Sequence, residues 1–186
     1  QYEKCGAGAI SILTEKFFFK GDLDHLSLIN RKTNLPILRK DFIIDSYQIF
    51  ESKVYKADAI LLILSILDDK QVIEFIKIAK DLELDCIIEI HSQEELKRAV
   101  KINYPVIGIN NRNLNTLKIN TGNSLNLSKD LITNFTIVAE SGIKKLEEIK
   151  NYNESGIYNF LIGESILRSN NIELKFKELL KNDNSS

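Results

Sequence analysis

Lys40, Glu89 and Glu140 each stand at or next to the end of a short apolar segment of the chain. Parallel strands present reactive side chains at their C-terminal ends, so these residues are candidates for chemistry. A lysine and a glutamate held together in a partly dry pocket can serve as general acid and general base, with pKa values shifted by burial and by each other. A salt bridge with no catalytic role is the alternative. We expect Asp41, on the opposite side of the strand from Lys40, to be structural.

Two glycine-containing turns follow the last two apolar segments of the sequence. They are "AESGI" (139–143) and "LIGES" (161–165). Gly142 and Gly163 permit a phosphate to come close to backbone N–H groups, and Ser141 adds a hydroxyl donor. Ordinary turns without a ligand are the alternative, but two such turns in consecutive positions favour a phosphate site.

Further polar and aromatic residues follow two other apolar segments. In "GINNRNL" (108–114), Asn110 and Arg112 offer amide and guanidinium donors for a substrate carboxylate, which a guanidinium can bind through two N–H groups. An Asn-rich turn that only caps a helix is the alternative. The run Phe17–Phe19 is placed to stack on an aromatic substrate, although we expect core packing to explain at least one of the three rings.

The composition indicates a globular protein with one domain over residues 1–186. The chain has 186 residues, 44% of them hydrophobic, and a net charge of -1. It contains no basic run that would track nucleic acid, and no apolar run of the ~18 residues that a membrane-spanning helix needs. Neither the two cysteines nor the two histidines are spaced as metal ligands. We therefore expect a cytoplasmic protein with no metal, no nucleic-acid partner and no membrane partner.

Segments rich in Ile, Val and Leu alternate with helix-like segments along the chain. The expected strands lie at 9–14, 36–40, 59–64, 86–90, 106–110, 136–140 and 160–163. The expected helices lie at 22–32, 45–56, 68–82, 92–102, 122–132, 144–152 and 172–181. Asp45, Asp68 and Ser92 are predicted to cap helices, and Glu95 to complete a capping box with Ser92. A repeat of roughly 20–30 residues is typical of right-handed βα units in a parallel sheet.

Two α/β architectures accommodate these seven βα units. One is an open doubly wound sheet, and the other is a (β/α)₈ TIM barrel whose first strand lies outside the sequence. An open sheet usually has a glycine-rich turn that opens a helix, whereas "CGAGAI" (5–10) precedes a strand. Lys40, Glu89 and Glu140 come from alternate strands, which share an interior layer in a barrel. We therefore predict a (β/α)₈ barrel, N-terminally incomplete, in which strands 2–8 are present.

These motifs, in their order and spacing, resemble one known enzyme family. The segments are "AISILTEKFFFKG", "LPILRKDFIID", "ADAILLI", "IIEIH", "GINNRNL", "AESGI" and "LIGESIL". Over residues 5 to 168 the chain is similar to indole-3-glycerol-phosphate synthase, a carboxy-lyase of tryptophan biosynthesis. The resemblance implies a (β/α)₈ barrel that needs no cofactor. It also implies a phosphorylated small-molecule substrate, 1-(2-carboxyphenylamino)-1-deoxyribulose 5-phosphate, whose indole ring closes with loss of CO₂ and water.

The resemblance also implies a role for each site residue. Lys40 would be the general acid that protonates the substrate's ketone oxygen, Glu89 would take part in proton transfers, and Glu140 would hold the electrostatic network. The remaining expected contacts are with the carboxylate (Asn110, Arg112), the aromatic ring (Phe19, Phe42, Leu61) and the phosphate (Ser141, Gly142, Gly163, Glu164).

The sequence departs from the family at its N-terminus. The family's first strand, which carries a second catalytic lysine, and its N-terminal helical extension should precede residue 1. We therefore expect residues 1–186 alone to be inactive. Two rival interpretations are a catalytically inactive phosphate-binding barrel and another barrel enzyme such as phosphoribosylanthranilate isomerase. The isomerase would need a cysteine and an aspartate as its acid–base pair, and Cys5 lies at the wrong end of its strand.

Overall fold

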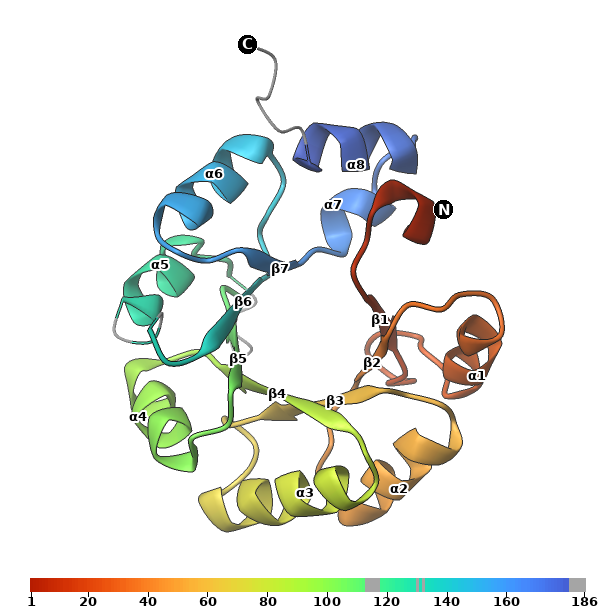
Figure 1. The fold of residues 1–186 in the computed structure, drawn as a ribbon, viewed down its shortest axis with the longest axis vertical. Coiled ribbons are helices and arrows are strands. Elements are labelled where there is room, and N and C mark those ends of the chain that lie inside the picture. The colour runs from red at the N-terminus through yellow and green to blue at the C-terminus, as the bar shows by residue number, and fades with distance from the viewer. Residues whose placement is uncertain (113–117, 130, 132, 181–186) are drawn as a thin grey trace.

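Seven parallel strands follow one another in chain order around a curved sheet, with the helices on its outer side (Figure 1). The computed structural model describes residues 1–112, 118–129, 131 and 133–180. The strands are β1 (Ile10–Leu13), β2 (Ile37–Lys40), β3 (Ala59–Ile63), β4 (Asp85–Ile90), β5 (Val106–Asn110), β6 (Thr136–Glu140) and β7 (Asn159–Leu161). Within the described residues, β1 and β7 form the two edges of this sheet. The seven predicted βα units of a (β/α)₈-type barrel are confirmed.

The helices are η1 (Glu3–Cys5), α1 (Asp24–Asn30), α2 (Ser46–Val54), α3 (Asp69–Asp81), α4 (Gln93–Ile102), α5 (Gly122–Ser128), α6 (Leu146–Glu154), α7 (Glu164–Leu167) and α8 (Ile172–Leu180). Helices α1 to α6 connect the strands, η1 precedes β1, and α7 and α8 follow β7. The predicted caps Asp45, Asp68 and Ser92 each accept a backbone N–H of the first helical turn. Among the described residues, no helix combines the length and the apolar character that crossing a membrane requires.

Three details differ from the sequence prediction. The short helices η1 and α7 were not expected, because three or four residues are too few to show a helical period. The helix expected over 122–132 is α5, and positions 130 and 132 lie outside the described residues. The prediction of a capping box at Ser92 is wrong. Ser92 does accept the Glu95 N–H, but the Glu95 carboxylate accepts the backbone N–H of His91 instead, at 2.8 Å.

The core has two layers because strand side chains alternate between the faces of the sheet. On β4, Ile88 and Ile90 pack between the sheet and the helices. On the inner face, Leu38, Leu61 and Ile63 form a separate apolar cluster. The inner cluster is small, and it leaves the C-terminal ends of the strands to polar side chains.

A buried ionic network fixes the end of β2 to α2. The Arg39 guanidinium lies 3.0 Å from Asp41 Oδ2 and 3.0 Å from Glu51 Oε2, and it donates to Gln48 O and Ser52 Oγ at 2.9 and 3.1 Å. Arg39 and Lys40 therefore point to opposite sides of the strand. Asp41 contacts Arg39 and is structural, as predicted.

We expect Arg39→Met to lower the free energy of unfolding by about 3–5 kcal/mol, because it leaves two carboxylates without their buried cation. Lys16→Met is the matched control, since Lys16 lies 3.9 Å from Asp22 with 63% and 43% of the two side chains exposed. This exposed pair should contribute less than about 1 kcal/mol. Urea unfolding of both variants measures the difference. Equal losses would show that the Arg39 network does not hold β2 to α2.

Candidate active site

The structure brings Lys40, Glu89 and Glu140 together inside the barrel. Lys40 Nζ lies 3.2 Å from Glu89 Oε2 and 3.1 Å from Glu140 Oε2, within hydrogen-bond distance of both. Both carboxylates are only 1% exposed, whereas the Lys40 side chain keeps 23% of its surface open. Lys40 is therefore the accessible member of the cluster, and the two carboxyl groups are buried.

Strand register explains why these three side chains meet. They lie on β2, β4 and β6, and alternate strands of a barrel contribute to the same interior layer. Gly108 on β5 is aligned with Glu89, and the next inward-facing position, Asn110, is aligned with Glu140. A Cβ atom at Gly108 would collide with Glu140 Oε1. The glycine therefore provides the space for the buried carboxyl group, a role that the sequence did not reveal.

Each member of the cluster has a shifted pKa with a definable cause. Burial would lower the pKa of Lys40, but the carboxylates of Glu140 and Glu89 outweigh it and raise that pKa. Burial would raise the pKa of Glu89, but Lys40 and His91 outweigh it and lower it. For Glu140, burial dominates and the neighbouring Glu89 adds to it, so that its pKa rises to about 8. One ammonium thus stabilises one ionised carboxylate, and the second carboxyl group keeps a proton at neutral pH.

Asn110 and Arg112, the expected carboxylate ligands, follow β5. Asn110 is buried, and its Oδ1 accepts the backbone N–H of Arg112 at 2.9 Å. The Arg112 guanidinium donates to Glu164 Oε2, also at 2.9 Å, and so links the end of β5 to the start of α7. The asparagine side chain supports its own turn, and the arginine lies next to the turn expected to bind phosphate.

The three consecutive phenylalanines lie in the loop after β1 and are all exposed. Phe17, Phe18 and Phe19 keep 84%, 81% and 51% of their surface open, so the expectation that core packing explains one of them is wrong. The Glu15 carboxylate accepts all three of their backbone N–H groups, so local hydrogen bonds hold this loop. The Phe19 ring lies 6.3 Å from that of Phe42, measured between centroids.

Leu61 and Phe42 continue this apolar wall toward the barrel interior. Leu61 on β3 is buried with Leu38, and Phe42 packs against the same cluster. Phe19, Phe42 and Leu61 therefore form a row that runs from the exposed loop to the inner face of the sheet.

The two expected phosphate turns lie on adjacent strands. Glu140 is aligned with Leu161, so the turns that follow β6 and β7 leave the sheet side by side. Ser141 and Gly142 have positive φ values of 64° and 85°, which turn the backbone sharply after the buried carboxyl group. A Cβ atom at Gly163 would meet no described atom within 4 Å, so this position is open.

Asn111 is a positioning residue, a role that the sequence did not reveal although its amide was a possible donor to the substrate carboxylate. Its Nδ2 donates to Ser141 O and to Tyr152 Oη, both at 3.0 Å, and its Oδ1 accepts from Ser124. The side chain thereby ties the turn after β6 to α5 and α6. Strand parity alone could have placed Asn111 on the outer face opposite Asn110, but the sequence does not position its partners, which lie on α5, on α6 and in the turn after β6.

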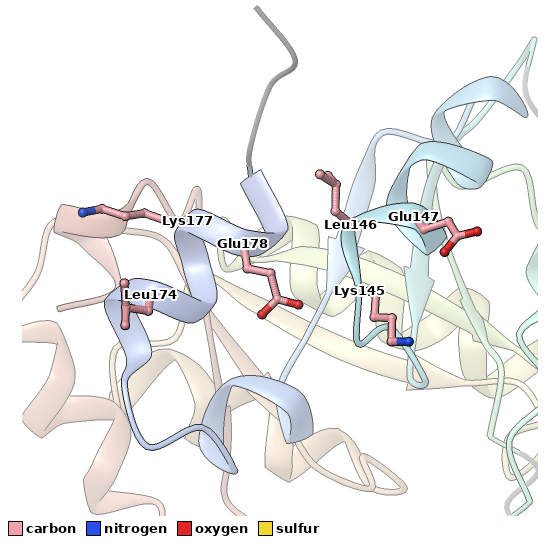
Figure 2. A pocket seen from close by; sticks show the side chains of 6 residues that line it. All are labelled: Lys145, Leu146, Glu147, Leu174, Lys177 and Glu178. Atoms are coloured by element: carbon pink, nitrogen blue, oxygen red, sulfur yellow. The ribbon is translucent and has the colours of Figure 1, made fainter. Parts of the chain in front are cut away.

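A groove of about 640 Å³ lies outside this site, between α6 and α8 (Figure 2). It is lined by Lys145, Leu146, Glu147, Leu174, Lys177 and Glu178. None of these residues belongs to the predicted site. Within the described part of the chain, no three His, Cys, Asp or Glu side chains are grouped as a metal site would require.

Comparisons with known proteins show which family this chain resembles in sequence. The family model "Indole-3-glycerol phosphate synthase" matches residues 1–179. The indole-3-glycerol phosphate synthase of Legionella pneumophila (strain Paris) is 46% identical over 179 residues, which cover 96% of this chain and 69% of that protein. The enzyme of the same name from Lachnoclostridium phytofermentans is 42% identical, with coverage of 96% and 66%.

Other similarities concern a longer relative and the fold. The tryptophan biosynthesis protein TrpCF of Buchnera aphidicola subsp. Schizaphis graminum is 47% identical over 178 residues, which cover 96% of this chain and 39% of that protein. A crystal structure of 3-hexulose-6-phosphate synthase has a TM-score of 0.76 at 13% identity, covering 96% of this chain and 89% of that chain. Thiamine phosphate pyrophosphorylase from Pyrococcus furiosus has a TM-score of 0.71 at 14% identity, covering 96% and 83%.

The two structural similarities show the fold alone, whereas the family model and the relatives from Legionella pneumophila and Lachnoclostridium phytofermentans share one name and match nearly the whole chain. The chain belongs to the indole-3-glycerol phosphate synthase family.

Proposed function

We propose that this chain carries the catalytic barrel for the reaction that names its family, the formation of indole-3-glycerol phosphate. The substrate would be 1-(2-carboxyphenylamino)-1-deoxyribulose 5-phosphate, and CO₂ and water would leave. The observation that carries the proposal is the Lys40 ammonium, held 3.2 and 3.1 Å from two buried carboxyl groups at the C-terminal edge of the barrel. A biosynthetic enzyme of this kind would act in the cytoplasm.

The cluster has the groups that ring closure needs. The aromatic carbon attacks the ketone carbon, a carbon–carbon bond forms, and the ketone oxygen takes a proton from Lys40. The resulting ring loses CO₂, and the electron pair of the broken carbon–carbon bond restores aromaticity. The ring carbon next to the nitrogen then gives up a proton to Glu89, the new hydroxyl takes a proton from reprotonated Lys40 and leaves as water, and the second double bond of the indole forms. Glu89, held as an anion, accepts protons in these steps. Glu140 keeps a proton near neutral pH and can return it to Lys40, 3.1 Å away.

The other site residues would orient the substrate around this cluster. Phe19, Phe42 and Leu61 would contact the aromatic ring. The substrate carboxylate would approach Asn110 and Arg112, where it competes with Glu164 for the guanidinium. The phosphate would bind the neighbouring turns at Ser141, Gly142, Gly163 and Glu164, the last two through backbone N–H groups.

The rival interpretations gain no specific support. An isomerase with a cysteine acid would need a thiol at the catalytic edge, but Cys5 lies in η1, before β1, and Cys86 packs in the outer core layer. Burial raises the pKa of the Cys86 thiol to about 12, so it holds its proton. An inactive barrel would have no need to keep an ammonium between two buried carboxyl groups.

Activity measurements require a complete catalytic unit. The chain spans 69% of the Legionella pneumophila relative. We propose that the family's first strand, with its second catalytic lysine, lies in the part that the chain does not cover. The completed enzyme is defined here as residues 1–186 preceded by the N-terminal part of that relative. Residues 1–186 alone should form no measurable product.

In the completed enzyme, Lys40→Met should lower kcat by about 10²–10⁴, the contribution typical of a positioned general acid. Lys53→Met is the matched control, because Lys53 lies on α2 with an exposed partner, Glu83, 3.9 Å away. Steady-state rates of product formation measure both variants. A Lys40→Met enzyme with nearly the parent kcat would mean that Lys40 is structural.

Gly163→Val should raise KM at least tenfold with a smaller change in kcat, because the side chain would occupy the space that the phosphate needs. No described atom lies within 4 Å of the added Cβ, so the substitution should leave the fold intact. Gly8→Val is the matched control, since Gly8 is equally open and precedes β1. A loss confined to kcat, with KM unaltered, would contradict the placement of the phosphate.

A further inference from the structure

His91, directly after β4, lies between two carboxylates. Its Nε2 is 3.2 Å from Glu89 Oε1, and its Nδ1 is 3.3 Å from Glu95 Oε2. The contact with Glu89 is close enough for an ion pair, although its geometry falls short of a hydrogen bond. The side chain is 10% exposed. Glu89 therefore touches His91 through one oxygen and Lys40 through the other.

The backbone around His91 fixes the ring in this position. Glu95 accepts the His91 backbone N–H at 2.8 Å, so one carboxylate holds both the main chain and the ring. From the α5 side, Asn123 Nδ2 donates to His91 O at 3.1 Å. Glu95 would complete a capping box if it turned back to Ser92, but it contacts His91 instead.

The charged groups around the ring come from four elements. Glu89 lies on β4 and Glu95 on α4, and both contact the imidazole directly. Lys40 on β2 and Glu140 on β6 lie beyond Glu89. The two groups in direct contact are acidic, so they favour the imidazolium over the neutral ring. The positive charge on His91 then faces the Glu89 oxygen that Lys40 does not reach.

We propose that His91 is a positioning residue for the ring-closing reaction, whose imidazolium, anchored by Glu95, keeps Glu89 ionised and turns its other oxygen toward Lys40. The kinetic part of this inference rests on the proposed function, while the electrostatic part concerns the folded chain alone. We assign His91 no direct contact with the substrate, because its charged partners are Glu89 and Glu95 and it acts through Glu89.

The direction of each pKa shift supports this arrangement. Burial would lower the pKa of His91, but the close carboxylates of Glu89 and Glu95 outweigh it and raise the pKa to about 9. A histidine whose pKa is raised on folding contributes stability that is complete below its unfolded pKa of about 6.5 and is lost as pH rises through the folded value. Its contribution should therefore fade between about pH 6.5 and 9.

The first measurement is the stability of the 186-residue chain against pH. His91→Gln keeps a polar side chain of similar size without the titrating charge, and His25→Gln is the matched control on the exposed face of α1. The loss of stability in His91→Gln should be largest below pH 6.5 and should shrink steadily toward pH 9. A loss that stays constant over this range would overturn the proposed imidazolium.

The second measurement is the pH profile of kcat/KM in the completed enzyme. In His91→Gln, Glu89 loses one of its two cationic neighbours, so its pKa should rise. The acidic limb of the kcat/KM profile should then shift to higher pH by about one unit. His91→Lys restores a permanent positive charge and should return the limb toward the parent position. A merely structural role would lower kcat/KM equally at every pH and leave the limb in place, which would overturn the positioning role.

The two hypotheses fail in different ways. Absence of product from the parent completed enzyme would refute the proposed function. An active parent enzyme whose acidic limb is unchanged by His91→Gln would refute the role of His91 and leave the proposed function standing.

Discussion

The candidate active site depends on one ammonium shared by two buried carboxyl groups. Two ionised carboxylates beside a single Lys40 would leave an uncompensated buried charge, and such a charge is costly in a medium of low polarity. The cluster avoids this cost because Glu140 retains a proton while Glu89 remains ionised. His91 and Glu95 extend the network on the Glu89 side. The result is a row of alternating charges that begins at α4 and ends inside the barrel.

The wall of the barrel positions this cluster, and the loops position the substrate contacts. Strand register brings β2, β4 and β6 to one layer, and Gly108 provides space for the Glu140 carboxyl group. The turns above the wall are held by long-range polar contacts. Asn111 connects the turn after β6 to Tyr152 on α6, and Arg112 connects the end of β5 to Glu164 on α7. Loop contacts of this kind let one rigid barrel present several groups to a ligand.

Much of this architecture could be predicted from the sequence, because apolar runs and strand parity are local properties. The seven strands lie within two residues of their expected bounds, and the alternate-strand rule anticipated that Lys40 and Glu140 would meet. The failures concern competition between partners. The Glu95 carboxylate accepts the His91 N–H instead of completing the capping box. The Glu15 carboxylate accepts the backbone N–H groups of three phenylalanines whose side chains are exposed. Such choices depend on three-dimensional proximity, which a one-dimensional pattern does not contain.

The most direct test of the central claim is a carbon-13 NMR titration of the glutamate side-chain carboxyl groups in the 186-residue chain, with Glu140→Gln and Glu89→Gln used for assignment. The account predicts that the Glu140 signal changes near pH 8, whereas Glu89 stays ionised well below the ordinary glutamate pKa of about 4.3. If both carboxyl groups titrated together near pH 4.3, Lys40 would not be held between one ionised and one protonated partner, and the proposed arrangement of acid and base would be wrong.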